Sequence, residues 1–274
     1  MIDFTPLARQ IFAGRLREAA RFVNHGDTVQ REELDMLLQQ ASRTEIGIKY
    51  GFGERMNYAQ FRERVPLHGY EELRSSIMRM VRGEKNVLWR GKVTHFAQSS
   101  GTSDGKSKYI PISSESFCRC HYRGGSDVVA HYLNINPESR IFSGMGFILG
   151  GSFANELNLP PGVKVGDLSA NLIDNINPVV NLVRVPDKHT ALMMDWSRKL
   201  PALVEASRKR NITNISGVPS WFLTVLKEVI KREGASCIHD VWPNLEVFFH
   251  GGISFEPYRD EYASICDNSR MHYL

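Results

Sequence analysis

The first ninety residues carry apolar side chains at the spacing of amphipathic helices. The apolar positions form two stripes: Leu7, Ile11, Leu16 and Phe22 with Ala19 and Ala20, and then Leu34, Leu37 and Leu38. Two shorter helices are expected at residues 57–64 and 70–81, because the Val65-Pro66 pair between them discourages a continuous helix. Gly83 follows the second of these and is suited to ending it.

The pattern changes after Gly91. Residues 93–97 form a short, β-prone segment preceded by glycine, which predicts a strand. A polar stretch at residues 99–107 follows, and residues 109–112 favour an extended conformation. Ser113 or Ser114 can then cap a helix with several apolar positions.

The rest of the chain alternates between strand and helix patterns. Further strands are expected at residues 140–149, 163–168, 211–215 and 245–249, and helices near residues 189–208 and 219–232. Such alternation predicts an α/β fold with mixed sheets flanked by helices, and ligands at the carboxyl ends of strands. We therefore expect a helical N-terminal region at residues 1–90, packed on an α/β region at residues 91–274.

Composition narrows the function classes. The 274 residues are 42% hydrophobic and 23% charged, with a net charge of +4 and no long run of like charges. This balance is typical of a globular protein and argues against a nucleic-acid-binding tail. No apolar run approaches the ~18 residues of a membrane span, and Asp3 and Arg9 interrupt any signal-peptide core. We expect a monomeric protein in the cytoplasm, with no nucleic-acid or membrane partner.

The four cysteines are too few for a disulfide scaffold in a chain of this length. Cys118, Cys120 and His121 invite a metal site, but residues two apart on a helix point to different sides. The sequence has no second cysteine pair to complete such a site. We expect buried or half-buried thiols and no metal site.

The polar stretch from Ser99 to Lys108 has the parts of a triphosphate cradle. Glycines allow close backbone approach to an anion, hydroxyls donate hydrogen bonds and lysines supply charge. These residues are Gly101 and Gly105, then Ser99, Ser100, Thr102 and Ser103, then Lys106 and Lys108. Glycine and serine also mark ordinary surface loops, and composition alone leaves both interpretations open.

The stretch is not a Walker A loop. Three residues separate Gly101 from Gly105, where that motif needs four, and Pro111 follows where its helix would begin. Residues 94–112 are therefore expected to form a strand, a loop and a strand.

The same residues resemble the phosphate loop of adenylate-forming enzymes, Ser-Gly-Thr-Ser/Thr-x-Gly-x-x-Lys. With the double serine, the loop is similar to that of the auxin-responsive Gretchen Hagen family of acyl-acid amido synthetases and their bacterial relatives. Blocks on either side match the family as well: Tyr70-Glu71-Glu72-Leu73, Ser216-Gly217-Val218-Pro219-Ser220-Trp221 and Leu245 to Gly252. The resemblance covers residues 55–274 in spaced blocks, and the loop is its most specific part.

The resemblance implies an ATP-dependent ligase. Such enzymes adenylate a carboxylic acid and then transfer the acyl group to the amine of an amino acid, with ATP and Mg²⁺. In the family, a strand like that at residues 270–274 is followed by a Tyr-x-x-Ser/Ala-Glu motif, which provides the magnesium ligand, and by a mobile lid domain. We therefore expect an N-terminal fragment that is inactive alone.

The resemblance also implies site residues. Lys108 and Thr102 would take part in catalysis, and Ser99, Ser100, Gly101, Thr102, Ser103, Gly105 and Lys108 would hold the phosphates. Gly251 and Gly252 would lie beside the adenine, and Arg123, Val218, Trp221 and Phe222 would contact the acid.

Some of these assignments have alternatives. Arg123 could instead form a surface salt bridge, because an ungapped count places Asp127 where the family's arginine is expected. Trp221 and Phe222 could fill the core, and the glycine pair could be a plain turn. His95 and His250 are left unassigned, because the chemistry needs no histidine.

Two other functions share the nucleotide site. A thioester-forming ligase performs the same first step with a different acceptor. A non-catalytic module would bind the nucleotide or the acid without any reaction.

Overall fold

The computed structural model describes residues 2–53, 56–99 and 107–274. The chain divides into two compact units, each built from separate stretches of sequence. One unit comprises Phe12–His131 and Ala154–Asn171, and the other comprises Met1–Ile11, Tyr132–Phe153 and Leu172–Leu274. These two units are compact bodies and need not coincide with functional domains. The expected domain boundary between residues 90 and 91 stays a proposal.

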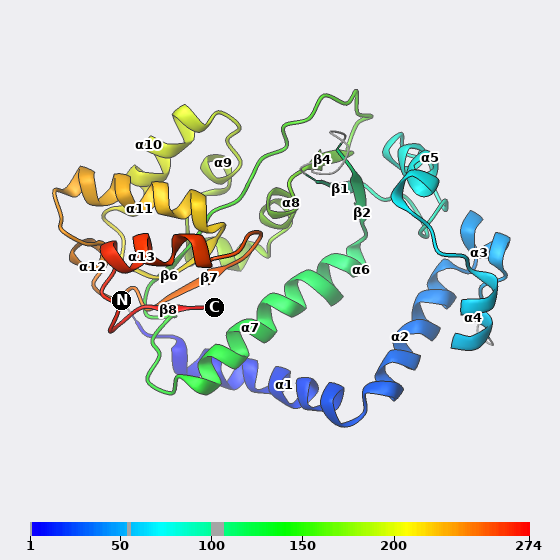
Figure 1. The fold of residues 1–274 in the computed structure, drawn as a ribbon, viewed down its shortest axis with the longest axis horizontal. Coiled ribbons are helices and arrows are strands. Elements are labelled where there is room, and N and C mark those ends of the chain that lie inside the picture. Colours follow the sequence, from blue (N-terminus) through cyan, green and yellow to red (C-terminus); the bar gives the residue numbers. More distant parts are fainter. Residues whose placement is uncertain (1, 54–55, 100–106) are drawn as a thin grey trace. The chain divides into compact units, whose positions relative to one another are not determined.

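The first unit contains a small mixed sheet and most of the N-terminal helices (Figure 1). Its central strand β1 (His95–Gln98) pairs antiparallel with β2 (Tyr109–Ile112) and parallel with β4 (Lys164–Gly166). Phe96 and Val165 are paired in register and fully buried, and they form the centre of this unit's core with Met80.

The helices of this region follow the expected spacing. They are α1 (Thr5–Asn24), α2 (Gly26–Ala41), α3 (Glu45–Tyr50), α4 (Tyr58–Arg64) and α5 (Tyr70–Val81), with α1 shared between the units. α4 starts at a capping box in which Asn57 and Gln60 each accept the other's backbone N–H at 3.0 Å. α5 has the expected bounds, and Gly83 follows it with φ of 91°. The first apolar stripe is not a buried face, since Leu7 is 55% and Ile11 is 68% exposed.

The chain leaves β2 in a helical run of several parts. Ser113 caps α6 (Ser114–Ser116) by accepting the N–H of Ser116 at 3.1 Å, as the sequence predicts. A π-helical turn, η1 (Phe117–His121), follows and leads into α7 (Tyr122–Ile135). Farther on, α8 (Leu168–Asp174) begins where a strand was expected to end.

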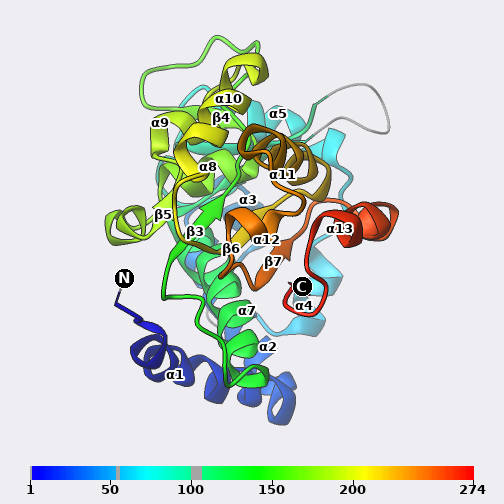
Figure 2. The same ribbon diagram turned by 90° about the vertical axis from the view of Figure 1, so that its left-hand side faces the viewer.

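The second unit is built on a parallel sheet in the order β5-β3-β6-β7-β8. Figure 2 shows β5, β3, β6 and β7 of this sheet, and Figure 1 shows β8 beside β7. Its strands are β5 (Arg184–Val185), β3 (Met145–Ile148), β6 (Ile212–Gly217), β7 (Val247–His250) and β8 (His272–Tyr273). Its helices are η2 (Pro178–Leu182), α9 (Lys188–Ala191), α10 (Trp196–Ser207), α11 (Pro219–Glu233), α12 (Ile238–Val241), η3 (Glu256–Tyr258) and α13 (Arg259–Ile265).

Strand alternation in β7 shows that both faces of this sheet are covered. The Phe248 ring packs against Phe222 of α11 and Tyr262 of α13, whereas the next ring, Phe249, packs edge-on against Tyr132 of α7. A parallel sheet buried on both faces is the arrangement that the α/β pattern predicts. The predicted fold class is confirmed.

Several expected elements differ from the observed ones, and three show why. The strand expected at 140–149 is only β3, because Ser143 N–H turns back to Arg140 O at 2.8 Å. The helix expected near 189–208 is split into α9 and α10, which Asp187 and Asp195 cap separately. The strand expected at 93–97 begins two residues later, at His95.

Candidate functional site

The β1–β2 hairpin positions the two described ends of the glycine-rich loop. Gln98 and Tyr109 form the last pair of its antiparallel ladder. Ser99 N–H donates to Lys108 O at 2.9 Å, and Lys108 N–H donates to Ser99 Oγ at 3.2 Å. Residues 109–112 form a strand, so the strand–loop–strand prediction is confirmed for the described residues and the Walker A alternative stays excluded.

The central residues of the loop lie outside the described residues. They are Ser100, Gly101, Thr102, Ser103, Gly105 and Lys106. Their predicted roles in holding phosphates stay predictions.

Tyr70 supports the hairpin, and sequence reasoning gave it no such role. Its hydroxyl accepts the backbone N–H of Tyr109 at 2.7 Å, and Lys108 Nζ lies 5.7 Å from its ring centroid. Tyr70 is the first residue of α5, so this helix start is tied directly to β2. The tyrosine lies in a block that resembles the family, but its contact spans 39 residues of sequence.

The predicted adenine-side glycines lie at the carboxyl end of β7 in the second unit. Gly252 has φ of 84°, and a Cβ there would be 3.3 Å from Val218 Cγ2, so glycine suits this position. A Cβ on Gly251 would meet nothing within 4 Å, and its N–H donates to Gly217 O at 3.3 Å. The turns after β6 and β7 therefore lie side by side at the sheet edge where α/β folds bind ligands.

Trp221 and Phe222, at the start of α11, have different environments. Phe222 is fully buried and packs against Phe147 with a ring distance of 5.1 Å, so it fills the core. Trp221 is 41% exposed, and its ring lies 5.9 Å from that of Trp196, which the sequence did not single out. Val218 is the N-cap residue of α11. Substrate contacts by these side chains stay predictions.

Arg123 forms the ion pair that its alternative assignment predicts. Its guanidinium pairs with Glu18 of α1 and lies 5.7 Å from the Phe22 ring centroid. Asp127, one turn later, binds Arg15 through both carboxylate oxygens, at 2.7 and 3.1 Å. Contact between Arg123 and a substrate stays a prediction.

The two unassigned histidines both have structural partners. His95 Nδ1 is 3.0 Å from Thr94 Oγ1, and its ring lies edge-on to Phe117. His250 stacks on Phe255 at 4.6 Å, and burial lowers its pKa, with a further contribution from Arg259. Neither contact indicates a catalytic base.

The cysteines are free, and two of them are more exposed than the sequence predicts. Cys118 and Cys120 are exposed because η1 turns Phe117 into the core and leaves both thiols outside. Among the described residues, no group of three or more His, Cys, Asp or Glu side chains could hold a metal ion. Within the same residues, no helix is long and apolar enough to cross a membrane.

A parallel α/β sheet together with a strand–loop–strand hairpin gives this chain the fold class of adenylate-forming enzymes. The chain belongs to the GH3 family, because the model of the GH3 family N-terminal domain matches residues 15–271. The predicted family resemblance is confirmed.

Several plant proteins are similar in sequence. An indole-3-acetic acid-amido synthetase GH3.4 of Arabidopsis thaliana is 28% identical over 116 residues, which is 42% of this chain and 19% of that protein. A probable indole-3-acetic acid-amido synthetase GH3.1 of Oryza sativa subsp. japonica is 34% identical over 112 residues, 39% of this chain and 18% of that protein.

The fold is similar to that of a solved AtGH3.15 acyl acid amido synthetase in complex with 2,4-DB. The TM-score is 0.77 at 16% identity, with 100% of this chain and 56% of that chain covered. The chain therefore spans about half the length of that solved protein.

Proposed function

We propose that this protein provides the nucleotide-binding part of an ATP-dependent acyl-acid amido synthetase. The observation that carries the proposal is the β1–β2 hairpin, whose loop ends at Ser99 and Lys108. The overall reaction would adenylate a carboxylic acid with release of pyrophosphate, and an amino acid amine would then attack the acyl-adenylate. The names of the relatives support amide formation.

Lys108 would neutralise the phosphates of ATP, and the hydroxyls and amides of the loop would orient them. Neither step needs a protein nucleophile, so positioning and charge stabilisation would provide most of the catalysis. The described end residues fit this role, since Ser99 and Lys108 meet at the end of a paired ladder. Thr102 would contribute a hydroxyl at the reacting phosphate.

The second unit would provide contacts to the remaining parts of the substrates. The open space above Gly251 would allow close approach of the adenine. Trp221, exposed at the start of α11, would contact the acid, with Val218 beside it.

Magnesium would accompany the nucleotide as the charge partner of its phosphates. The described residues provide no metal cluster, so no step proposed for this chain goes through the ion. Mg²⁺ commonly binds through one or two carboxylates and the phosphates themselves. We propose a monomer in the cytoplasm with small-molecule acids and amino acids as partners.

Binding and turnover measurements test the proposal. The 274-residue chain should bind ATP in a calorimetric titration, and Lys108→Ala should weaken that binding. The 274-residue chain, or a longer chain that contains it, should release pyrophosphate from ATP with at least one member of a panel of carboxylic acids. Hydroxylamine should trap the acyl-adenylate, and amino acids or coenzyme A as acceptors would then separate amide from thioester synthesis. ATP binding without any pyrophosphate release would favour a non-catalytic module.

A further inference from the structure

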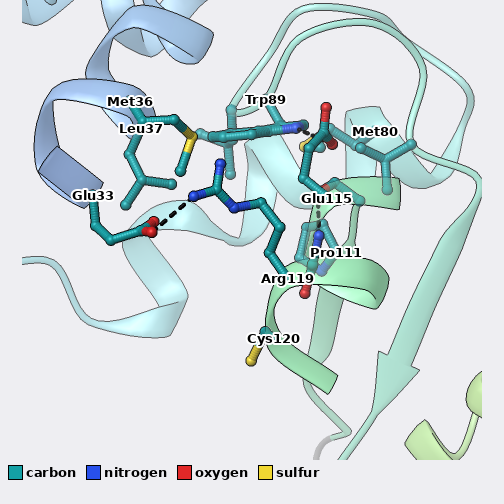
Figure 3. Close-up of a pocket in the computed structure, with 13 residues that line it drawn as sticks. Glu33, Met36, Leu37, Met80, Trp89, Pro111, Glu115, Arg119 and Cys120 are labelled. Atoms are coloured by element: carbon teal, nitrogen blue, oxygen red, sulfur yellow. Dashed lines mark hydrogen bonds and ion pairs between the residues drawn. The ribbon is translucent and has the colours of Figure 1, made fainter. Parts of the chain in front are cut away.

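The first unit contains a pocket of about 430 Å³ that the proposed reaction does not use. Figure 3 shows it between α2, the segment after α5 and the start of the helical run beyond β2. Its wall is mainly apolar and includes Met36, Leu37, Met80, Trp89 and Pro111. The volume lies within the range of small-molecule sites, about 300–1,000 Å³.

The three charged side chains that line the pocket, Glu33, Glu115 and Arg119, are all paired. Arg119 Nη2 donates to Glu33 Oε1 at 2.7 Å. Glu115 accepts from Arg90 at 2.6 Å and from the indole N–H of Trp89 at 3.2 Å. The Arg90 hydrogen bond is the main reason that the pKa of Glu115 is lowered to about 2, so this carboxylate is ionised at neutral pH.

The charge balance determines which ligands suit the pocket. An added carboxylate would meet Glu33 and Glu115, and an added ammonium group would meet Arg119. Arg90 is not part of the lining, but it neutralises Glu115. A charged ligand would therefore have to displace one existing pair. The indole N–H of Trp89 is already bonded, which leaves its ring for apolar contact. Met36 and Met80 add flexible thioethers, which adapt to the shape of an aromatic ring.

The pocket lies toward the other end of β2 from Lys108, the described end of the glycine-rich loop. β2 begins at Tyr109 beside Lys108, whereas the pocket is lined by Pro111 and Ser113 at the other end of this strand. Along extended chain, Pro111 is three residues from Lys108, roughly 10 Å, and Ser113 is five residues away, roughly 16 Å. A ligand in the pocket need not touch the loop.

We propose that this pocket is a separate binding site for a small aromatic molecule without net charge. The site rests on its own lining, so it stands whether or not the chain belongs to an active ligase. Glu33, Glu115 and Arg119 all keep their partners when the ligand binds.

Fluorescence titration of the 274-residue chain with N-phenyl-1-naphthylamine tests the site. Its sulfonated relative 8-anilinonaphthalene-1-sulfonate has the same ring system and a negative charge. We expect the uncharged probe to bind at least tenfold more tightly than the sulfonate. Equal or tighter binding of the sulfonate would overturn the proposed selectivity.

The cysteines of η1 provide a matched pair of variants. Both are exposed, but Cys120 lines the pocket and Cys118 does not. Cys120→Trp should fill the pocket and weaken binding of the uncharged probe at least tenfold, whereas Cys118→Trp should leave it unchanged. Equal effects of the two variants would refute the location.

A second variant changes the pocket from α2, which leaves the π-helical turn η1 unaltered. Leu37 is 47% exposed, so Leu37→Glu should fold and would add a third carboxylate at the pocket. Circular dichroism of each variant should match that of the unmodified chain. We expect at least fivefold weaker binding of the uncharged probe, and unchanged binding by a folded Leu37→Glu variant would refute the proposal.

Discussion

Ser99 and Lys108 are joined by two hydrogen bonds, one from each backbone N–H, although eight residues separate them in the sequence. One of these bonds uses the Ser99 hydroxyl, so this side chain helps to close the base of the loop. The ladder below them ends at the Gln98–Tyr109 pair. A loop closed in this way presents its ends at a defined separation, which a phosphate site requires.

The first prediction concerns the charge of Lys108. If its ammonium binds ATP phosphates, Lys108→Ala should weaken ATP binding by about 1.5–3 kcal/mol, the range of a charge-assisted hydrogen bond. Calorimetric titration measures the change. Lys231→Ala is the control, because that lysine side chain is 80% exposed on α11. Equal ATP affinity in Lys108→Ala and the unmodified chain would contradict the assignment.

The second prediction separates the two contacts of Tyr70. Tyr70→Phe keeps the ring near Lys108 but leaves the Tyr109 N–H without its acceptor, which should cost about 1–2 kcal/mol of the free energy of unfolding. Tyr70→Leu removes both contacts and should weaken ATP binding more than Tyr70→Phe does. Urea unfolding and ATP titration measure the two effects.

The exposed Tyr58 of α4 offers a control for these variants. It is 65% exposed, so Tyr58→Phe should change neither the unfolding midpoint nor the ATP affinity. If Tyr70→Phe behaves in the same way, the hydroxyl does not support the hairpin.

The sequence predicts the exact bounds of some elements, because capping residues and glycines mark their ends. α5 starts after Gly69, whose N–H donates to Glu72, and it stops before Gly83. β5 has two residues and no alternating pattern, so the sequence contains no signal for it.

In the candidate site, too, some features follow from local sequence and others depend on tertiary packing. The hairpin and its loop follow from local residue types, but the contrast between Trp221 and Phe222 does not. Both are apolar and adjacent, and only the packing of α11 on the sheet buries Phe222 and leaves Trp221 exposed. The role of Tyr70 likewise depends on a tertiary contact that no local pattern reveals.

The third prediction concerns the pH dependence of stability through His239. This histidine is 6% exposed, its Nδ1 accepts the Asp267 N–H at 3.0 Å, and its Nε2 lies 2.9 Å from Leu245 O. Burial lowers its pKa below 6.5, although the hydrogen bond to Leu245 O and the charges of Asp267 and Asp240 oppose this shift. The unfolded chain therefore binds a proton near pH 6.5 that the folded protein does not bind until lower pH.

The free energy of unfolding should consequently fall as the pH drops below 6.5, by up to about 1.4 kcal/mol per pH unit for this one group. His239→Gln should be less stable at pH 7.5 and should lose less stability between pH 7.5 and 5.5. His250 has a shift of the same sign, so some pH dependence should remain. The exposed His131 provides the control variant, His131→Gln. An unchanged pH slope in His239→Gln would exclude this histidine as a cause.

The last prediction concerns Glu246, which anchors the start of β7. Its carboxylate accepts the Tyr132 hydroxyl at 2.9 Å, the Arg140 N–H at 2.9 Å and the Ser139 hydroxyl. Glu246→Gln places an amide donor against one of these three donors and should lower the free energy of unfolding by about 1–2 kcal/mol. Glu246→Ala leaves all three without an acceptor and should cost about 2–4 kcal/mol.

Urea unfolding measures both losses. Glu228→Ala on α11 is the matched control, because Glu228 pairs with the exposed Lys231 at 4.0 Å. Since β7 runs from this anchor to Gly251 and Gly252, Glu246→Ala should also loosen the proposed adenine side of the site. ATP affinity should then fall more in Glu246→Ala than in Glu246→Gln. A Glu246→Ala variant as stable as Glu228→Ala would show that the three donors find other acceptors and that the start of β7 needs no such anchor.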